Sequence, residues 1–585
     1  MGQFFKIFFA SLLALIVFTV VAVFITLGII GSITSSDKPV IGANAILYID
    51  LSQPMMEQSV GNPLAQLGAE EQYDVPGLYD VVRMIHYAKS DSSVKGIYLK
   101  CNDNNNGLAA SEELRNAIID FKQSHKFVCA YGDVISQRAY YVANIADKIY
   151  CNPRGGIEWK GLSLQYMFFR QALDKLEIEP QIFYAGKFKS ATEPFRADGM
   201  TDANRLQSTV FLNDIYARFL METAAAINTD TATLHQYANN MLVRSASDAV
   251  SYKLADAAKY DDEVKDELRV RVGIGKTGKL NFVVPGKYAK AVNYKGGKGD
   301  DKIALIFAQG DIVDGKGENG EIGGETYRNL VRKARMDDDV KAIVVRVNSG
   351  GGSAMASENI WRELEVARKD KPVIISFGDY AASGGYYMSC GADSIFAQPN
   401  TLTGSIGVFS IVPNLKKFFN NKLGVTFDGV KTATYADMST ASRPLNDAEK
   451  RFFQNDVDSI YHTFLTRVSN GRNMNLALVD SIAQGRVWTG SRGVDLGLVD
   501  KLGGLQDAID CAAGMAKLKD YRLKEFPEPT SWWDKFFGTY QKNAKTKALK
   551  AEMGEDGYHV YSSFQKIKQF IGSSQTRLPF EMVIE

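Results

Sequence analysis

The sequence has few of the side chains that build metal sites and disulfide frameworks. Only five cysteines and five histidines occur among its 585 residues. The cysteines are widely spaced, form no CxxC pair and are odd in number, so a disulfide scaffold is not expected. The histidines cluster neither with one another nor with cysteine. We therefore expect no metal ion and no other cofactor.

The sequence also lacks an excess of charge of either sign. Its 68 Lys and Arg residues stand against 67 Asp and Glu residues, which leaves a net charge of +1. Because phosphate binding needs a concentrated excess of Lys and Arg, no nucleic-acid partner is expected. The 45% hydrophobic and 23% charged residues are ordinary for a globular chain. We therefore do not expect the chain to be intrinsically disordered over most of its length.

One stretch near the N-terminus has no charged residue at all. Residues 8–31 are apolar and long enough to cross a bilayer core of about 30 Å. The alternative is a cleavable secretory signal, whose apolar core usually runs about 7–15 residues before a small-residue cleavage site. We predict an uncleaved transmembrane anchor over 8–31. Lys6 indicates a cytoplasmic N-terminus over residues 1–7, which places the large body outside the cytoplasm.

The chain contains an internal duplication. Two segments align without a gap over about seventy residues. Val94 matches Val340 and Gly161 matches Gly407, and both pairs lie 246 positions apart. Chance similarity does not hold such a constant register, so we expect two copies of one domain.

Each copy alternates strand and helix patterns. Residues 342–347 and 372–377 are short β-branched runs, and residues 356–368 carry apolar side chains at helical spacing. This alternation indicates a parallel sheet in a layered α/β domain. The predicted division is an N-terminal copy at 45–290, a glycine-rich linker at 291–302, a C-terminal copy at 303–515 and a tail at 516–585.

The two copies differ where chemistry is expected. The second copy has a glycine loop at Asn348–Ser353, whose backbone N–H groups can turn toward a ligand. The first copy has an asparagine run at 102–106 in that place. The second copy also has Ser383 before Gly384 at a strand-to-helix junction, where N–H groups can stabilise an oxyanion. The first copy has Gln137 there, so only the second copy offers a nucleophile.

A simpler interpretation competes with Ser383 as a nucleophile, and the residues alone do not identify the general base. A lone serine before two glycines is more often a helix N-cap. The glycine loop, and the loss of both features from the first copy, favour the nucleophile. None of the histidines lies in a motif that would bring it to Ser383. A buried lysine can serve as a base; Lys189 is a candidate, with Lys187 two residues away.

These motifs resemble the signal peptide peptidase A family, also called protease IV, in its long, duplicated bacterial form. The resemblance spans roughly residues 1–515. It implies an α/β fold of two tandem Clp-protease/crotonase-like domains behind an N-terminal transmembrane helix. The motifs that carry it are Phe188–Phe195, Asn348–Ser353, Asp379–Tyr386 and Thr403–Gly407.

The resemblance also assigns roles to single residues. It implies Lys189, not Lys187, as the general base and Ser383 as the nucleophile of a serine peptidase. Gly384 and Gly352 are implied as backbone oxyanion donors. Ser405 is implied to orient the lysine, with a purely structural turn as the alternative. The sequence departs from the family pattern at Gly350, where proline is frequent, and at Phe188, where tyrosine is common.

A substrate, a location and an assembly are implied in the same way. The family cuts remnant signal peptides, after their release from preproteins, within their apolar core, and other membrane-associated peptides are further candidates. The body would lie on the periplasmic side of the bacterial inner membrane, held by a single span. A homotetramer with a concave interior facing the membrane is expected. The alternatives left open are a crotonase-like acyl-CoA enzyme and a non-enzymatic membrane scaffold.

Overall fold

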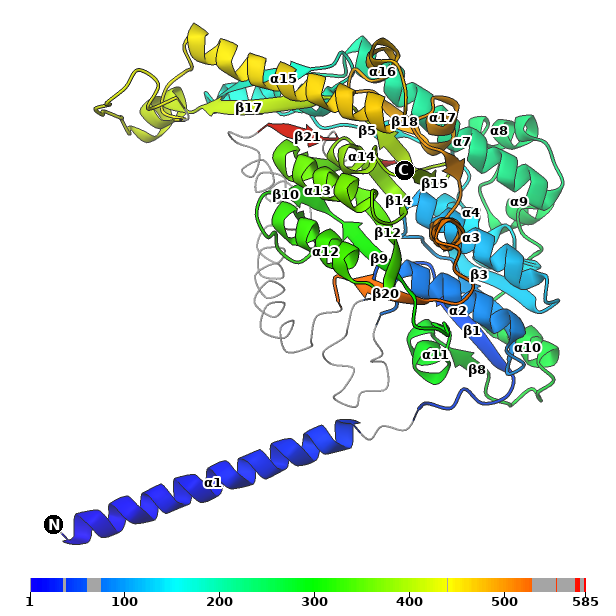
Figure 1. Cartoon of the computed structure of the whole chain (residues 1–585). Coiled ribbons are helices and arrows are strands. Elements are labelled where there is room, and N and C mark those ends of the chain that lie inside the picture. The colour runs from blue at the N-terminus through cyan, green and yellow to red at the C-terminus, as the bar shows by residue number, and fades with distance from the viewer. Residues whose placement is uncertain are drawn as a thin grey trace.

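The computed structural model describes residues 2–34, 38–59, 75–438, 440–528, 554, 574–578 and 583–584. Figure 1 shows a body of strands flanked by helices, with one long helix running out from it. The aromatic segment 532–537 and the basic segment 542–550 of the predicted tail lie outside the described residues. The predicted linker 291–302 runs from the last residue of α11 (Pro285–Ala291) to the first residue of β9 (Lys302–Gln309), and no helix or strand occurs between them.

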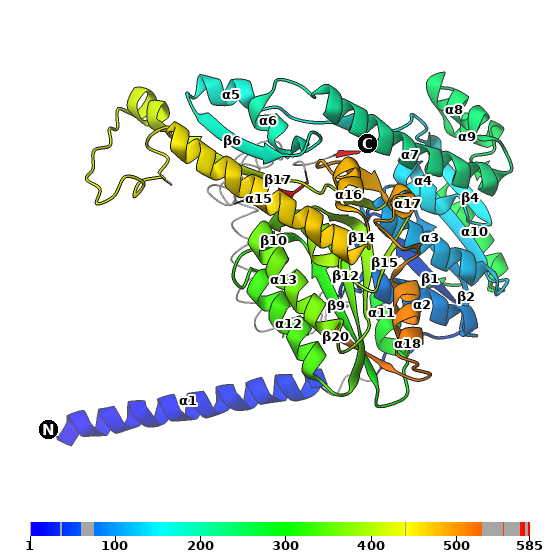
Figure 2. The ribbon, with the colours of Figure 1, turned by 45° about the horizontal axis from the view of Figure 1, so that its top comes forward.

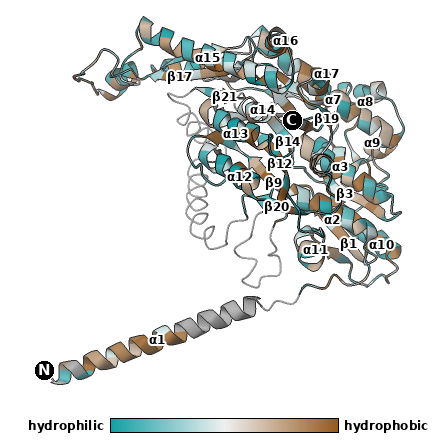
Figure 3. Cartoon of the chain, in the orientation of Figure 1, coloured by the Kyte–Doolittle hydropathy of each residue, from teal (hydrophilic) through white to brown (hydrophobic). Residues whose placement is uncertain are grey.

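The N-terminal helix α1 (Gly2–Thr34) is longer than the predicted span. Its window Gly2–Val21 has a mean hydropathy of 2.5, and none of that window is buried. Hydrophobic residues dominate this part of α1 in Figure 3. By length and composition α1 can cross a membrane.

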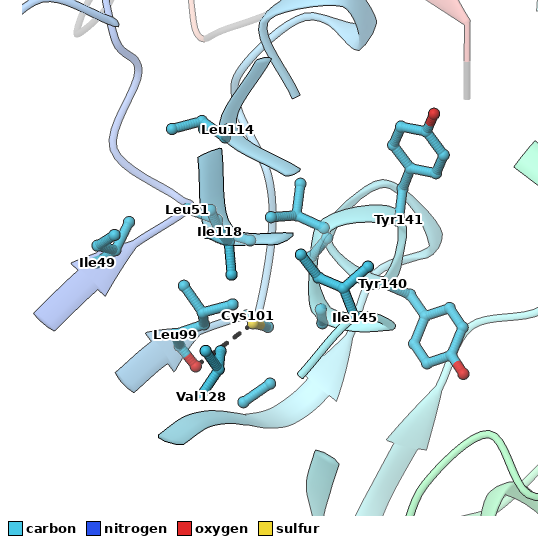
Figure 4. Packing of buried hydrophobic residues seen from close by; sticks show 14 of the residues in the cluster. Ile49, Leu51, Leu99, Cys101, Leu114, Ile118, Val128, Tyr140, Tyr141 and Ile145 are labelled. Atoms are coloured by element: carbon cyan, nitrogen blue, oxygen red, sulfur yellow. Dashed lines mark hydrogen bonds between the residues drawn. The ribbon is translucent and has the colours of Figure 1, made fainter. Parts of the chain in front are cut away.

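The first copy forms a parallel sheet with the strand order β7-β4-β3-β2-β1-β8. Alternate residues face opposite sides, so Leu47 and Leu99 lie in one apolar cluster and Ile46 and Tyr98 in another. Figure 4 shows the first cluster, with Cys101 among aliphatic side chains. The strands are β1 (Ala45–Asp50), β2 (Val94–Lys100), β3 (Phe127–Ile135), β4 (Lys148–Ile157), β7 (Ala257–Ala258) and β8 (Asn281–Val283).

The second copy repeats this sheet, with the order β18-β16-β14-β12-β9-β20; β15 pairs with β14 outside this path, and β19 pairs with β15. The order β12-β9-β20 matches β2-β1-β8, as a duplication requires. Apart from β9, its strands are β12 (Val340–Ser349), β14 (Val373–Ala382), β15 (Ser394–Ala397), β16 (Leu402–Gly404), β18 (Val487–Thr489), β19 (Lys501–Leu502) and β20 (Arg522–Phe526).

Side-chain bonds repeat between the copies as well. Tyr141 donates to Glu112 in the first copy, and Tyr387 donates to Glu358 at 2.6 Å in the second. Tyr387 lies 246 positions after Tyr141 and Glu358 lies 246 positions after Glu112, the same offset as in the sequence alignment. The duplication predicted from the sequence is therefore present in the structure as two tandem α/β domains.

A third sheet joins the two copies, in the order β11-β10-β13-β21-β17-β6. It takes β6 from the first copy, β10, β11, β13 and β17 from the second, and β21 from the C-terminal tail. A short pair of β5 (Leu164–Gln165) with β22 (Val583–Ile584) lies apart from it. The strands of the third sheet are β6 (Glu179–Ala185), β10 (Asp311–Val313), β11 (Glu321–Gly323), β13 (Gly351–Ser353), β17 (Val408–Asn414) and β21 (Gln575–Arg577).

The helices cover the sheets and extend the body, and Figure 2 shows α7 and α15 along its upper side. The first copy contains α2 (Leu78–Ser90), α3 (Leu108–Lys122), α4 (Gln137–Ala143), α5 (Arg170–Lys175), α6 (Glu193–Arg196), α7 (Asp202–Ile227), α8 (Thr231–Asn239), α9 (Ala246–Ser251), α10 (Asp261–Arg271) and α11. The second contains α12 (Gly324–Met336), α13 (Ala354–Ala367), α14 (Gly384–Ser389), α15 (Asp447–Gly471), α16 (Leu476–Ile482), α17 (Gly490–Asp495) and α18 (Leu505–Met515).

Candidate active site

Ser383 is the single residue between β14 and α14. Its φ and ψ are 55° and −112°, a conformation that is costly for a residue with a Cβ atom. The Ser383 N–H donates to the Gly404 carbonyl at 2.8 Å, and the Tyr387 N–H donates to the Ser383 carbonyl at 2.7 Å. These bonds hold the serine at a sharp turn at the end of the central strand.

The Ser383 hydroxyl does not cap α14. Ser383 occupies the N-cap position, but its side chain makes no capping hydrogen bond. A hydrogen bond of 2.7 Å joins its Oγ to Lys189 Nζ instead. The Ser383 hydroxyl is therefore not a helix cap, which is the role that the competing interpretation gave it.

Lys189 is buried beside the serine, with 1% of its surface exposed. Its Nζ also lies 3.1 Å from both the carbonyl oxygen and the Oγ of Ser405. All three of these partners are neutral oxygens. Burial lowers the pKa of Lys189 well below its ordinary value, which favours a neutral amine that can accept a proton.

The backbone of the first copy carries Lys189 into the second. β6 pairs antiparallel with β17, from Ala185 opposite Val408 to Glu179 opposite Asn414, and Lys189 follows four residues after β6. Two glycines make room for its side chain. A Cβ atom on Gly407 would lie 3.1 Å from Lys189 Cδ, and one on Gly485 would lie 2.7 Å from Lys189 Cβ. Glycine is thus favoured at position 407, the last residue of the Thr403–Gly407 motif, because a larger residue would crowd the Lys189 side chain.

Gln207 on α7 fixes the segment around the lysine. Its Nε2 donates to the Phe188 carbonyl and to Ser190 Oγ, both at 3.0 Å. Its Oε1 accepts from the Val487 N–H at 3.1 Å. This buried amide therefore ties the lysine segment to β18 of the other copy. No sequence pattern points to Gln207, because a lone glutamine within a helix matches no motif.

The two candidate oxyanion donors lie together. A Cβ atom on Gly384 would lie 3.1 Å from the Gly352 nitrogen. Gly351, between β12 and the donor, has a φ of +101°, a value that favours glycine. A Cβ atom there would lie 2.7 Å from the Gly384 nitrogen. Gly352 therefore lies beside Gly384, the residue that follows Ser383, and the oxyanion role of both glycines stays a prediction.

The other sequence candidates lie elsewhere. Lys187 is exposed, and its Nζ lies 5.8 Å from the Phe188 ring centroid. In the first copy, the Gln137 side chain fills the place of a nucleophile. It accepts from the Lys160 and Gly161 N–H groups at 3.0 and 3.1 Å and donates to the Gly161 carbonyl. Its polar atoms are thus occupied by the first copy's own loop.

A buried ionic cluster joins the copies behind the glycine loop. Arg346 on β12 is fully buried and pairs with Glu57 and Glu113 of the first copy at 2.8 and 2.7 Å. Glu57 also accepts from Asn348 at the base of the glycine loop, at 2.8 Å. Burial raises the pKa of Glu113. The cluster thus connects the first copy directly to the loop.

A carboxylate of the second copy caps a helix of the first. Asp379 Oδ1 accepts from the Ala109 and Ala110 N–H groups of α3 at 2.9 and 3.2 Å. A Cβ atom on Gly107, the N-cap of α3, would lie 2.1 Å from the Asp379 carboxyl. Glycine is therefore required at position 107 so that the cap can come from the other copy.

The described residues contain no cluster that could bind a metal ion and no disulfide. Within the described part of the chain, no group of three or more His, Cys, Asp or Glu side chains could hold a metal ion. All five cysteines are free. Burial raises the pKa of Cys151 to about 11, which keeps that thiol protonated at neutral pH. The expectation that no cofactor is needed stays a prediction.

Comparison with known proteins assigns the chain to a family. The model of peptidase family S49 matches twice, at residues 120–275 and 365–519. Protease 4 of Salmonella typhi is 35% identical over 86% of this chain and 83% of its own length. Protease 4 of Haemophilus influenzae is 35% identical over 79% and 77%, and the chloroplastic serine protease SPPA of Arabidopsis thaliana is 33% identical over 76% and 67%. The chain belongs to peptidase family S49 and is a serine peptidase.

Proposed function

We propose that Ser383 is the nucleophile and Lys189 the general base of this peptidase. The observation that carries the proposal is the 2.7 Å bond between Lys189 Nζ and Ser383 Oγ, made by a lysine whose burial favours the neutral amine. A neutral amine has two N–H groups, which suit the two Ser405 oxygens, and one lone pair, which suits the Ser383 proton. Ser405 is therefore the positioning residue of the lysine.

The reaction begins when Ser383 Oγ attacks a peptide carbonyl carbon and passes its proton to Lys189 Nζ. The Gly384 and Gly352 N–H groups hold the oxyanion of the tetrahedral intermediate. The lysine ammonium then protonates the departing amine, which leaves an ester between the acyl group and Ser383. Water attacks this ester, with Lys189 again taking the proton, and frees the acid and the serine.

The substrates that fit best are remnant signal peptides in a membrane, with other membrane-associated peptides as further candidates. The motifs resemble those of signal peptide peptidases, and α1 has the length and composition to place the enzyme at a bilayer. We propose a single span in the bacterial inner membrane with the body on the periplasmic side. The proposed division is residues 45–290 and 303–515 for the two copies, 291–302 for the linker and 516–585 for the tail.

An assembly of several copies, with a homotetramer as the expected form, is supported by an exposed apolar arm. The segment between β17 and α15 projects away from the body in Figures 1 and 2. Its side chains at Leu423, Phe427, Val430 and Tyr435 are exposed. Exposed apolar side chains gathered on one segment mark protein interfaces. Light scattering of the detergent-solubilised chain gives the number of subunits.

The dyad is tested by covalent labelling. A fluorophosphonate probe reacts with serines that a base has activated, so it should label the parent chain and fail to label Ser383→Ala. The crotonase-like acyl-CoA enzyme and the non-enzymatic scaffold need no activated serine, and family membership already favours the peptidase over both. Labelling that persists undiminished in Ser383→Ala would contradict the proposal.

A further inference from the structure

Asn348 lies where two neighbouring strands change their register. Between Val347 and Ser349 the pairing of β12 with β14 shifts, so that one residue of β12 lies opposite three of β14. Such a bulge leaves backbone groups without a partner in the ladder. The Asn348 side chain supplies one partner, because its Oδ1 accepts from the Tyr380 N–H at 3.2 Å. The Asn348 amide thus joins the two strands across the bulge.

The bulge directly precedes both parts of the candidate site. The chain runs four residues from Asn348 to the proposed oxyanion donor Gly352, and three residues from Tyr380 to Ser383. The two segments meet again at the site, where a Cβ atom on Gly384 would lie 3.1 Å from the Gly352 nitrogen. The position of the nucleophile relative to the donor therefore depends on how β12 and β14 are joined at the bulge.

Glu57 of the first copy fixes the orientation of the Asn348 amide. Its Oε1 accepts from Asn348 Nδ2 at 2.8 Å, and its Oε2 accepts from Arg346 Nε at 2.8 Å. Because a carboxylate only accepts hydrogen bonds and a backbone N–H only donates them, the amide can satisfy Glu57 and Tyr380 together in one orientation alone. Glu57 is 4% exposed, so water does not readily replace either partner.

The backbone on both sides makes room for this carboxylate and holds it. A Cβ atom on Gly378 would lie 2.6 Å from Glu57 Oε1 and 2.9 Å from Asn348 Cγ. The Glu57 N–H donates to Gln309 Oε1 at 3.1 Å, and Gln309 pairs with Asn348 in the sheet. The first copy therefore contacts the bulge through a residue whose backbone and side chain are both bound to the second copy.

The cross-copy carboxylate belongs to the copy that contains the serine. In the first copy, Lys100 occupies the position of Arg346 and pairs with Asp50 of its own copy at 3.6 Å. In the copy that contains Ser383, Arg346 instead takes Glu57 from the other copy. The pairing at this position thus differs between the copies together with the presence of the nucleophile.

We infer that Glu57 is a positioning residue of the peptidase and acts through Asn348. By fixing the bulge of β14, it sets the position of Ser383 Oγ relative to the Gly352 N–H. The first copy thus contributes two groups to the reaction, Lys189 as the base and Glu57 behind the oxyanion site. A correctly placed donor stabilises the transition state more than the bound substrate, so Glu57 acts on kcat and not on KM. This inference rests on the proposed roles of Ser383 and Gly352.

The first experiment measures hydrolysis of an internally quenched apolar peptide by the full-length parent, Glu57→Gln, Asn348→Asp and the double variant. A glutamine has one acceptor where Glu57 has two, so either Arg346 or Asn348 then faces a donor. Glu57→Gln should lower kcat about 10–10²-fold and leave KM within about twofold. Asn348→Asp, which places two carboxylates in contact, should have the same effect.

The double variant restores every bond of the network. The glutamine Nε2 can donate to the new aspartate, whose second oxygen accepts from the Tyr380 N–H, while the glutamine Oε1 accepts from Arg346 Nε. The kcat of the double variant should therefore return to within about threefold of the parent value, a non-additive result that marks residues acting together.

Glu113→Gln is the matched control. Glu113 is as buried as Glu57 and pairs with the same Arg346 at 2.7 Å, but it is Glu57 whose carboxylate bonds Asn348. Glu113→Gln should therefore lower the melting temperature about as much as Glu57→Gln while it keeps the kcat of the parent. Asn348→Ala is the second variant if Glu57→Gln does not fold. It keeps the pair of Glu57 with Arg346 and should lower kcat by the same factor.

A peptide aldehyde tests the oxyanion position separately from turnover. Ser383 Oγ bonds to the aldehyde carbon as the carbonyl π bond breaks, the serine proton passes to Lys189, and the new oxyanion meets the Gly352 N–H. The inhibition constant should therefore rise in Glu57→Gln and Asn348→Ala by the factor by which kcat falls. It should stay at the parent value in Glu113→Gln, although that variant is less stable.

The outcomes separate this inference from the proposed function. Equal kcat in folded Glu57→Gln and Glu113→Gln, a parental kcat in Asn348→Ala, or a double variant no faster than the slower single variant would overturn the role of Glu57 and leave the dyad standing. A rise in KM without a fall in kcat would also overturn it. Absence of hydrolysis by the parent, or undiminished hydrolysis by Ser383→Ala, would overturn the proposed function and, with it, this inference.

Discussion

Lys189 Nζ lies 2.7 Å from Ser383 Oγ, although 194 residues separate the two side chains in the sequence. The bond crosses from the first copy of the duplicated domain to the second. Neither copy alone therefore contains the dyad. The two copies contribute different residues to the site: the second copy contains the serine and the glycine loop, and the first copy contains the lysine.

The pH dependence of the reaction follows from the buried lysine. Only the neutral amine can take the Ser383 proton, so kcat/KM should rise with pH through the pKa of Lys189 and then level off. Because burial lowers this pKa well below the ordinary value, the plateau should begin well below the ordinary lysine pKa of about 10.4. A pH–rate profile of the solubilised chain checks this. An activity that falls as pH rises from neutrality would contradict a lysine base.

The same burial makes Lys189 a cost to stability. Between the lowered pKa and the ordinary one, the unfolded chain binds a proton that the folded chain does not, so stability rises with pH across that window. Lys189→Met should lower the rate of hydrolysis by about 10³-fold or more. It should also raise the melting temperature at neutral pH, with the gain shrinking as pH approaches about 10. A variant that melts lower than the parent at pH 7 would argue against a neutral buried lysine.

The glycine loop offers a matched pair of variants. A Cβ atom on Gly352 would lie 2.0 Å from the Ile312 carbonyl oxygen, so Gly352→Ala must displace a proposed oxyanion donor. A Cβ atom on Gly350 would lie no closer than 3.6 Å to any atom outside its immediate neighbours. Gly352→Ala should lower kcat about 10²–10³-fold, and Gly350→Ala far less. Equal losses in the two variants would remove the argument for Gly352.

The ionic cluster between the copies should be a main determinant of stability. Glu57→Ala leaves Arg346 short of one buried partner and should cost about 3–5 kcal/mol of unfolding free energy. Glu528→Ala breaks the exposed pair with Lys333 and should cost about 0–1 kcal/mol. Denaturant titration of both variants measures the difference. A Glu57→Ala chain as stable as Glu528→Ala would show that the cluster contributes little.

Much of the fold was predictable from local patterns. The runs at 342–347 and 372–377 and the helix at 356–368 correspond to β12, β14 and α13. The ends of the strands were not predicted, because β14 continues through Gly378 and Asp379, which interrupt its apolar run. Asp379 belongs there because its carboxylate caps α3 of the other copy. Such a partner is 270 residues distant and leaves no local signal.

Part of the candidate site was likewise predictable from the sequence, and part was not. Ser383 and its glycines could be found because the first copy has lost them, and the comparison needs only the sequence. Lys189 could be named only through family resemblance, since its burial arises from the pairing of β6 with β17 and from the space left by Gly407 and Gly485. The position of β21 between β13 and β17 was not predicted at all, because a short polar strand in a tail carries no pattern.

The central claim is tested most directly by hydrolysis of a quenched apolar peptide with the full-length variants Ser383→Ala, Lys189→Ala and Lys187→Ala. Ser383→Ala and Lys189→Ala should lose hydrolysis to background while remaining folded by circular dichroism. Lys187→Ala should keep the activity of the parent, because its exposed amine lies outside the site. Substantial hydrolysis by Ser383→Ala or Lys189→Ala would contradict the dyad, and loss of hydrolysis in Lys187→Ala alone would assign the base to Lys187.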